Sequence, residues 1–156
     1  MERKYLKKVK EREIRMEKMS FEMESRSCNE QFARVVVAVF LSRLDPTVEE
    51  LDDVKTAVSE AVTNCIIHGY EGGDGIIRIE VVLEERTATI RVIDWGVGIA
   101  NVKKAMEPLY TSKPGEDRCG MGFAFMEAFM DELAVQSVPG EGTVVTMKKT
   151  IGKAEL

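Results

Sequence analysis

The feature that most constrains this chain is an acid and an amide in an apolar segment, Glu60 and Asn64. At that spacing a helix stacks both side chains on one face. Burying the carboxylate beside Val58, Val62 and Ile66 is costly unless a proton, a cation or hydrogen bonds compensate for it. The segment therefore predicts a helix that holds a polar site as well as part of a core.

Size and composition indicate one globular domain with no general affinity for nucleic acid. The chain has 156 residues, 44% of them hydrophobic and 31% charged. A chain of this length buries roughly 70% of the surface that its unfolded form exposes, which is enough for one core. The net charge of -5 differs from the basic balance of a phosphate-binding surface, so we expect no direct nucleic-acid partner.

The cysteines and the apolar runs favour a cytoplasmic protein. The three cysteines lie far apart and only one histidine accompanies them, so neither a disulfide framework nor a zinc site is predicted. No apolar run approaches the ~20 residues of a membrane span. The charged N-terminus is not followed by the hydrophobic segment of a signal peptide. We therefore expect no membrane partner.

The N-terminal residues mix lysine and arginine with glutamate, and we interpret residues 1–17 as a basic extension, either disordered or a polar helix. Residues 18–150 are predicted to form the folded domain, and residues 151–156 a tail. The domain begins with residues 18–24, where apolar and polar side chains alternate as in a strand.

A first helix is predicted after this strand. Ser27-x-x-Glu30 is the pattern of a capping box, and helical spacing continues to about Leu44. The apolar residues that recur at this spacing are Phe32, Val35, Val36, Val39, Phe40 and Leu44.

A second helix carries the acid and the amide. It begins either with Asp45 capping ahead of Pro46 or with Thr47 pairing with Glu50, and Gly69 ends it. The expected buried stripe is Leu51, Val54, Val58, Ala61, Cys65 and Ile66.

The second half of the chain alternates strands with shorter helices. Residues 77–83 and 88–92 predict an antiparallel hairpin that ends at Asp94. The elements expected after it are a short helix over 101–107, a polar loop over 108–118, a helix opening at 120–123, and strands over 133–137 and 143–150. This order predicts an α+β fold, a two-layer sandwich in which helices cover one face of a mostly antiparallel sheet.

Three separated motifs fit together. They are the acid and amide at 60–64, the Asp-x-Gly-x-Gly turn at 94–98, and the Gly-x-Gly at 120–122 that opens a helix after a loop. Each alone is weak evidence. In this order they resemble the N box and the two glycine boxes of the ATP-binding (Bergerat) fold shared by gyrase B, the MutL proteins and histidine kinase catalytic domains.

Longer segments resemble the anti-sigma F factors of spore-forming bacteria, which are serine kinases. The likeness covers about residues 19–149, and its matching segments are 32–35, 44–47, 59–64, 67–70, 108–114 and 120–123. The resemblance implies a homodimer that binds ATP or ADP with Mg²⁺ and sequesters a sigma factor, sigma F. It also implies that the chain phosphorylates a serine of an anti-anti-sigma antagonist.

The resemblance also implies roles for single residues near the base and the metal. Asp94 accepts a hydrogen bond from the exocyclic amino group of adenine, and Thr143 makes a second, water-bridged adenine contact. Gly96 and Gly98 let the backbone approach the nucleotide closely. Asn64 is a ligand of Mg²⁺.

Further residues are implied to serve the phosphates and the transfer itself. Gly120, Met121 and Gly122 present backbone amides at a helix N-terminus, which favours phosphate. Lys113 and Arg118 neutralise charge on the transferred group. Glu60 is the general base that takes the proton of the attacking serine.

Several interpretations stay open at this level. Arg34 is either a solvated charge or a docking residue for the sigma factor or the antagonist. Trp95 departs from the family pattern and covers either the nucleotide or the core, while His68 is expected to be structural. The alternative functions are an anti-sigma B-type stress-response kinase, an ATP-gated binding module without phosphotransfer, and a histidine kinase catalytic domain cut from a longer receptor.

Overall fold

The computed structural model describes residues 16–107 and 121–152. The strands in this part of the chain are β1 (Met16–Glu24), β2 (Ile76–Glu84), β3 (Thr87–Asp94), β4 (Glu132–Val138) and β5 (Gly142–Thr150). The helices are α2 (Ser27–Leu41), α3 (Val48–Asn64), α4 (Val102–Ala105) and α5 (Gly122–Phe129), with a 3-10 turn η1 (Ser42–Leu44) and a π-helical turn η2 (Cys65–Gly69).

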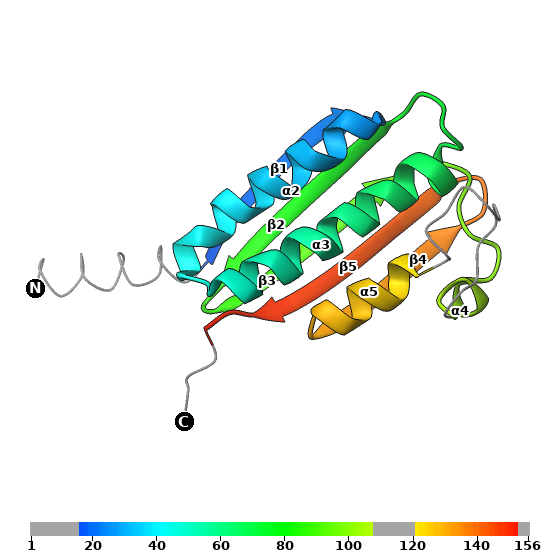
Figure 1. Cartoon of the computed structure of the whole chain (residues 1–156). Coiled ribbons are helices and arrows are strands. Elements are labelled where there is room, and N and C mark those ends of the chain that lie inside the picture. Colours follow the sequence, from blue (N-terminus) through cyan, green and yellow to red (C-terminus); the bar gives the residue numbers. More distant parts are fainter. Residues whose placement is uncertain (1–15, 108–120, 153–156) are drawn as a thin grey trace, which may run out of the picture.

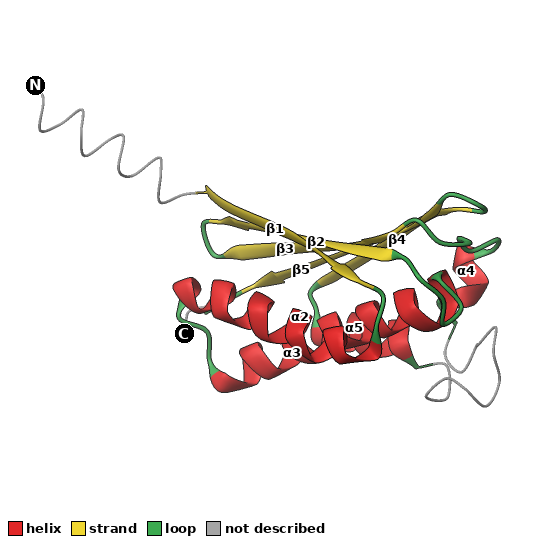
Figure 2. Ribbon diagram, turned by 90° about the horizontal axis from the view of Figure 1, so that it is seen from above, coloured by secondary structure: helices red, strands yellow, loops and turns green. Residues whose placement is uncertain are grey.

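The strands form one antiparallel sheet in the order β1-β2-β3-β5-β4. Helices α2, α3 and α5 lie along one face of it, with α3 between the other two (Figure 1), and the opposite face carries no helix of the described chain (Figure 2). The predicted α+β sandwich is confirmed. Its strands β2 and β3 form the predicted hairpin and bring Asp94 to a strand end.

Successive side chains of the strands alternate strictly between the two faces of the sheet. Every second residue of β2 and β3 points at the helices and is buried, because successive strand side chains face opposite sides. The core residues that these two strands and β5 supply are Ile77, Ile79, Val81, Leu83, Ala88, Ile90, Val92, Val145 and Met147. The period-two pattern therefore predicted the sheet side of the core correctly.

The apolar residues that recur along the first helix divide between the core and the surface. Phe32, Val35 and Val39 are 55%, 50% and 68% exposed, whereas Phe40 is buried and Leu44 packs against the core. The buried residues of α2 are Ala33, Val37, Ala38, Phe40 and Leu41. Apolar residues occur on both sides of this helix, so spacing alone did not choose the core side; the side with two small alanines packs inward.

The two capping patterns had opposite outcomes. Ser27 is the first residue of α2 and caps nothing: Arg26 occupies the N-cap position without a side-chain hydrogen bond. The capping box of α3 is present, because Thr47 Oγ1 accepts from the Glu50 N–H at 3.1 Å and Glu50 Oε1 accepts from the Thr47 N–H at 2.9 Å. Of the two starts left open for this helix, the one at Thr47 is confirmed.

Replacing Thr47 with alanine is expected to lower the free energy of unfolding by about 1 kcal/mol, because the N–H of Glu50 loses its acceptor. Urea unfolding followed by circular dichroism measures the change. Ser27→Ala is the matched control, and we expect its effect to stay within about 0.5 kcal/mol, as for a surface substitution. Equal losses in the two variants would contradict this account of the caps.

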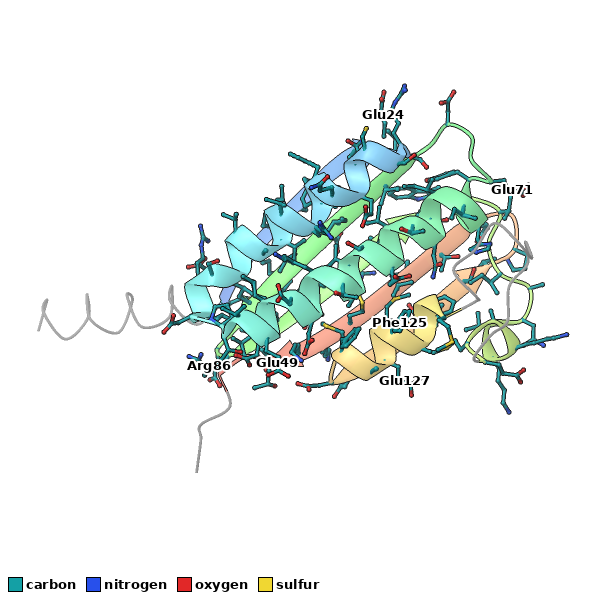
Figure 3. The ribbon with its side chains drawn as sticks, in the orientation of Figure 1. Glu24, Glu49, Glu71, Arg86, Phe125 and Glu127 are labelled. Atoms are coloured by element: carbon teal, nitrogen blue, oxygen red, sulfur yellow. The ribbon has the colours of Figure 1, made fainter. Side chains whose placement is uncertain are left out.

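Glu50 and Arg86 tie the C-terminal end of β5 to the helices. The second carboxylate oxygen of Glu50 accepts from the Gly152 N–H at 2.8 Å, and its hydrogen bonds, first that from Thr47, lower the pKa of this carboxyl. Arg86, in the turn between β2 and β3, donates to the carbonyls of Ile151 and Leu44 at 2.7 and 2.6 Å (Figure 3). Ile151 is fully buried, so the packed domain includes it.

Candidate functional site

The acid and the amide of α3 meet the start of α5. Glu60 is buried, with 6% of its surface exposed, and Asn64 is half-buried one turn later. A Cβ atom added to Gly122 would lie 3.2 Å from Asn64 Oδ1, 3.3 Å from its Nδ2 and 3.4 Å from Glu60 Oε2. The structure thus brings together three residues that the sequence predicted in two separate motifs, and glycine leaves the space between them free.

Asp94 forms a second polar position at the end of β3. Its carboxylate is almost fully buried, and its Oδ1 accepts from the Gly96 N–H at 2.9 Å. Burial raises the pKa of Asp94, and the Gly96 N–H, the Cys65 thiol and the Thr143 N–H oppose that shift because donors beside the carboxylate favour its charged form. Asp94 is therefore a buried acceptor surrounded by donors.

The π-helical turn η2 presses the end of α3 against the turn after Asp94. The Val97 N–H donates to the Gly69 carbonyl at 2.9 Å, and a Cβ on Gly96 would lie only 2.0 Å from that same oxygen. Tyr70, just after η2, accepts from the Trp95 N–H through its hydroxyl at 2.9 Å, and burial raises the pKa of this hydroxyl. π-helical turns often occur at functional sites. Here η2 joins the Asp-x-Gly-x-Gly turn at 94–98 to the helix that carries Glu60.

The hairpin between β4 and β5 holds the same turn from the other side. Gly98 has a left-handed φ of 73°, and a Cβ there would lie 2.3 Å from the Val138 carbonyl oxygen. Gly142, at φ 129°, approaches the Asp94 carbonyl so closely that a Cβ would lie 2.1 Å from its oxygen. The Gly140 N–H donates to the Val97 carbonyl at 2.7 Å. These close backbone approaches explain why the segment needs glycine.

Thr143 lies beside Asp94, its partner across the β3–β5 ladder, and is buried. Its hydroxyl is 2.8 Å from the Ser137 hydroxyl. Ser137 also donates to the Gly142 carbonyl at 2.9 Å and accepts from the Ile99 N–H at 2.8 Å. Ser137 thus anchors the threonine predicted to contact a ligand.

The other predicted site residues lie farther out or outside the described residues. Met121 is the N-cap residue of α5, directly before Gly122. Arg34 is half-buried on α2, which does not choose between its two interpretations. Trp95 is 55% exposed, so it is not a core residue, and this exposure does not choose between covering the nucleotide and covering the core. The predictions for Lys113, Arg118 and Gly120 fall outside the described residues.

The residues at this end of the sheet suit a ligand with one polar group near Asp94 and another near Glu60 and Asn64. Asp94 is a buried acceptor at the end of β3, and the carboxylate of Glu60 and the amide of Asn64 meet the start of α5 at Gly122. Among the residues that the structure describes, no group of three or more histidine, cysteine, aspartate and glutamate side chains is arranged to hold a metal ion. In the same residues no helix is long and apolar enough to cross a membrane.

Comparison with known sequences places the chain in a protein family. The histidine kinase-like ATPase domain family matches residues 24–149. The anti-sigma F factor of Clostridium acetobutylicum is 57% identical over 138 residues, which span 88% of this chain and 96% of that protein. The chain belongs to the anti-sigma F factor family. Other anti-sigma F factors agree: that of Clostridium beijerinckii is 60% identical over 133 residues, 85% of this chain and 93% of that protein.

Solved structures show that this anti-sigma F family chain has the expected fold. The RsbU and RsbW domains of a Mycobacterium tuberculosis protein superpose with a TM-score of 0.61 at 19% identity, covering 86% of this chain and 32% of the other. A blue-light activated histidine kinase of Erythrobacter litoralis gives 0.52 at 19% identity, over 76% of this chain and 41% of the other. At that identity the likeness concerns the fold alone, and it agrees with the ATPase domain family.

The sequence motifs of this anti-sigma F family member did not reveal the residues that support its site. Cys65 was assigned to the core stripe alone, and Ser137 and Tyr70 were given no role in the site. For Ser137 a signal exists, because the alternation of β4 puts it on the helix side at the strand end facing Thr143. For Tyr70 and Cys65 none exists, since their contacts depend on the π-helical turn.

Proposed function

We propose that this chain binds ATP with Mg²⁺ at the site between α3, α5 and the ends of β3 and β5, and transfers the γ-phosphoryl group to a serine of an antagonist protein. The observation that carries the proposal is the convergence of Glu60, Asn64 and Gly122, with carboxylate and amide atoms within 3.4 Å of where a Cβ on that glycine would lie. An ATPase domain fold around this convergence supports it.

The adenine end of the nucleotide is assigned to Asp94. Its buried carboxylate, once ionised, is an acceptor only and suits the exocyclic amino group. Thr143, held by Ser137 through a 2.8 Å contact between the hydroxyls, is the second contact. The turn that contains Gly96 and Gly98, which lack side chains and so can contact the Gly69 and Val138 carbonyls closely, is proposed to lie against the base.

The phosphate end is assigned to the start of α5. Backbone amides at a helix N-terminus favour phosphate, and those of Gly120, Met121 and Gly122 are the candidates. Asn64 offers a side-chain oxygen, the ligand type that Mg²⁺ prefers. Because Mg²⁺ usually keeps waters and phosphate oxygens as its other ligands, one protein ligand is sufficient. The charge of the bound Mg²⁺ would neutralise the phosphates. Lys113 and Arg118 are proposed to assist from the loop before α5.

Glu60 is proposed as the general base. The partner serine Oγ bonds to the γ-phosphorus, the bond from that phosphorus to the β–γ bridging oxygen breaks, and ADP leaves. The serine proton passes to the Glu60 carboxylate. General-base assistance is typically worth ~10²–10⁴ in rate. The burial of Glu60 among core residues of α3 keeps competing water away from it.

The regulatory role follows from the family. We propose that the chain is a cytoplasmic anti-sigma factor that holds a sigma factor, sigma F, away from RNA polymerase. An anti-anti-sigma antagonist displaces the sigma factor and is phosphorylated on serine. Arg34 on α2 is the proposed docking residue. A sigma B-type stress-response partner is the alternative within the same class.

We further propose a homodimer that uses the exposed apolar residues of α2. Phe32, Val35 and Val39 point away from the core, and α2 lies along β1, the edge strand of the sheet (Figure 1). An apolar helix face beside a strand edge with unpaired backbone groups is a surface that natural proteins cover. A second copy of the chain would cover both at once.

Val39→Asp is expected to shift the protein from dimer to monomer, because the new charge would be buried in the contact. Sedimentation velocity across a concentration series measures this. Val48→Asp is the matched control: Val48 is 78% exposed in the first turn of α3, and we expect no change in its dimer fraction. A Val39→Asp dimer as tight as the unmodified one would exclude this face.

Transfer of γ-labelled phosphate from Mg-ATP to the candidate antagonist protein tests the enzymatic proposal. Label on an antagonist serine is the expected result. Tight ATP binding without transfer would instead indicate the nucleotide-gated binding module, in which ATP only orders the polar loop over 108–118. Label on a histidine would indicate the histidine kinase alternative.

A further inference from the structure

We propose that Ser137 is a positioning residue for nucleotide recognition: it takes the hydroxyl proton of Thr143, so that Thr143 presents an acceptor to the 6-amino group of adenine. The inference rests on the nucleotide binding proposed above. It gives Thr143 a direct contact with the amino group, in place of the water-bridged contact that the family resemblance implies. It also gives a role to a strand residue that lies outside the three sequence motifs.

Ser137, Thr143 and Asp94 form one row across three neighbouring strands (Figure 1). Thr143 of β5 pairs with Asp94 of β3 on one side and with Ser137 of β4 on the other. Directly paired residues point to the same face of a sheet, with Cβ atoms about 4.5–5.5 Å apart. That face is the one toward the helices, because a Cβ on Gly69 of η2 would lie 3.0 Å from Asp94 Oδ1. The row therefore lies at the adenine end of the proposed site.

The other hydrogen bonds of Ser137 leave its oxygen one acceptor position for Thr143. A serine hydroxyl has one proton and two acceptor positions. Its proton goes to the Gly142 carbonyl at 2.9 Å, because a carbonyl oxygen can only accept, and one acceptor position takes the Ile99 N–H at 2.8 Å. The Thr143 hydroxyl, whose oxygen is 2.8 Å from Ser137 Oγ, must then be the donor in the contact between the two hydroxyls.

Thr143 consequently offers a ligand lone pairs and no proton. Its one proton is held by Ser137, so its oxygen can take part in a further contact only as an acceptor. Thr143 and Asp94 are 7% and 5% exposed, so bulk water has little access to either group and does not turn the hydroxyl around. The threonine oxygen and the ionised carboxylate are thus two neighbouring acceptors.

Two acceptors at this spacing suit an amino group. The 6-amino group of adenine has two N–H bonds at about 120° in one plane, and with hydrogen bonds of about 2.9 Å these reach oxygens about 5 Å apart. One N–H would go to Asp94 and the other to Thr143. A base without the amino group leaves both acceptors without a donor, and a buried polar group left unpaired lowers affinity.

The test compares ADP with purine riboside 5′-diphosphate, which lacks the 6-amino group but keeps the ring nitrogens, by isothermal titration calorimetry. In Ser137→Ala the proton of Thr143 is released and can turn toward the amino group, where two donors would meet. We expect ADP to bind about three- to tenfold more weakly, as for one hydrogen bond, and the analogue to change by less than about twofold. Thr143→Val should give the same pattern.

Further variants separate this role from packing. Ser137→Thr keeps a hydroxyl and should keep the affinity for ADP. Gln136→Ala is the matched control, because Gln136 is the exposed neighbour of Ser137 on β4, and neither affinity should change. Adding Ser137→Ala to Thr143→Val should weaken ADP no further, because Ser137 acts through Thr143. Circular dichroism melting shows which variants fold; Ser137→Cys, whose sulfur is a weak acceptor, serves if Ser137→Ala does not.

Equal weakening of both ligands in Ser137→Ala would overturn the proposal, because packing or a ring nitrogen would then account for the loss. No weakening, or additive losses in the double variant, would overturn it as well, since Ser137 would not act through Thr143. If the unmodified chain binds ADP and the analogue equally well, the inference fails while nucleotide binding stands. Failure of the unmodified chain to bind ADP would overturn the proposed function itself.

Discussion

Glu60→Gln is expected to bind ADP and ATP as the unmodified chain does and to transfer phosphate about 10²–10⁴ times more slowly. Glutamine has nearly the shape of glutamate and fills the same buried space beside Asn64 and Gly122. It cannot take a proton from the attacking serine. Affinity from calorimetry and single-turnover transfer of labelled phosphate separate the two effects.

Glu127→Gln is the matched control for that variant. Glu127 is an exposed acid on the outer side of α5, the helix that begins at the site (Figure 3), and removing its charge should leave transfer unchanged. Transfer at the normal rate in Glu60→Gln would remove Glu60 from the mechanism. Loss of nucleotide affinity in that variant would instead make Glu60 a structural acid of the pocket.

Much of this fold could be predicted because its patterns have one physical interpretation. The alternation of β2 and β3 leaves a single choice of buried face, and the hairpin brings Asp94 to the sheet end. The stripe of α3 was also predicted well: Val54, Val58 and Ala61 are fully buried. In these elements polar residues occupy one side, so the period alone identifies the core.

Where two physical solutions fit one pattern, sequence did not choose. Helix α2 has apolar residues on both sides, and only packing against the sheet shows that Ala33 and Val37 face inward while Val39 does not. Ser27 and Thr47 carry the same capping pattern, yet only Thr47 caps. A cap depends on where the chain enters the helix, which is a property of the preceding turn.

Some residues of the candidate site could likewise be predicted from the sequence, and others could not. Glu60, Asn64 and Gly122 were predicted from motifs, and the packing of α5 on α3 brings them together. The support of the site by Cys65 and Ser137 was not predicted. Those contacts depend on a π-helical turn and on the register of β4 with β5, neither of which leaves a short sequence signal.

Gly98→Ala is expected to destabilise the protein by about 2–5 kcal/mol and to abolish measurable nucleotide binding. Two causes combine. Alanine is strained at the φ of 73° that this residue adopts, and its Cβ would lie 2.3 Å from the Val138 carbonyl oxygen and 2.9 Å from Pro139 Cα. Both neighbours are backbone atoms, so the turn after Asp94 and the β4–β5 hairpin must separate.

Gly140→Ala distinguishes strain from collision. Gly140 has a similar φ of 80°, but among the residues that the structure describes none other than its chain neighbours has an atom within 4 Å of the position of its Cβ. Alanine there should cost only the ~1–2 kcal/mol of a left-handed conformation and leave nucleotide affinity unchanged. Urea unfolding and calorimetry on both variants give the comparison. If the two lose the same stability and both bind ADP, the contact between the glycine turn and the hairpin does not shape the site, and the role of Gly98 is conformational only.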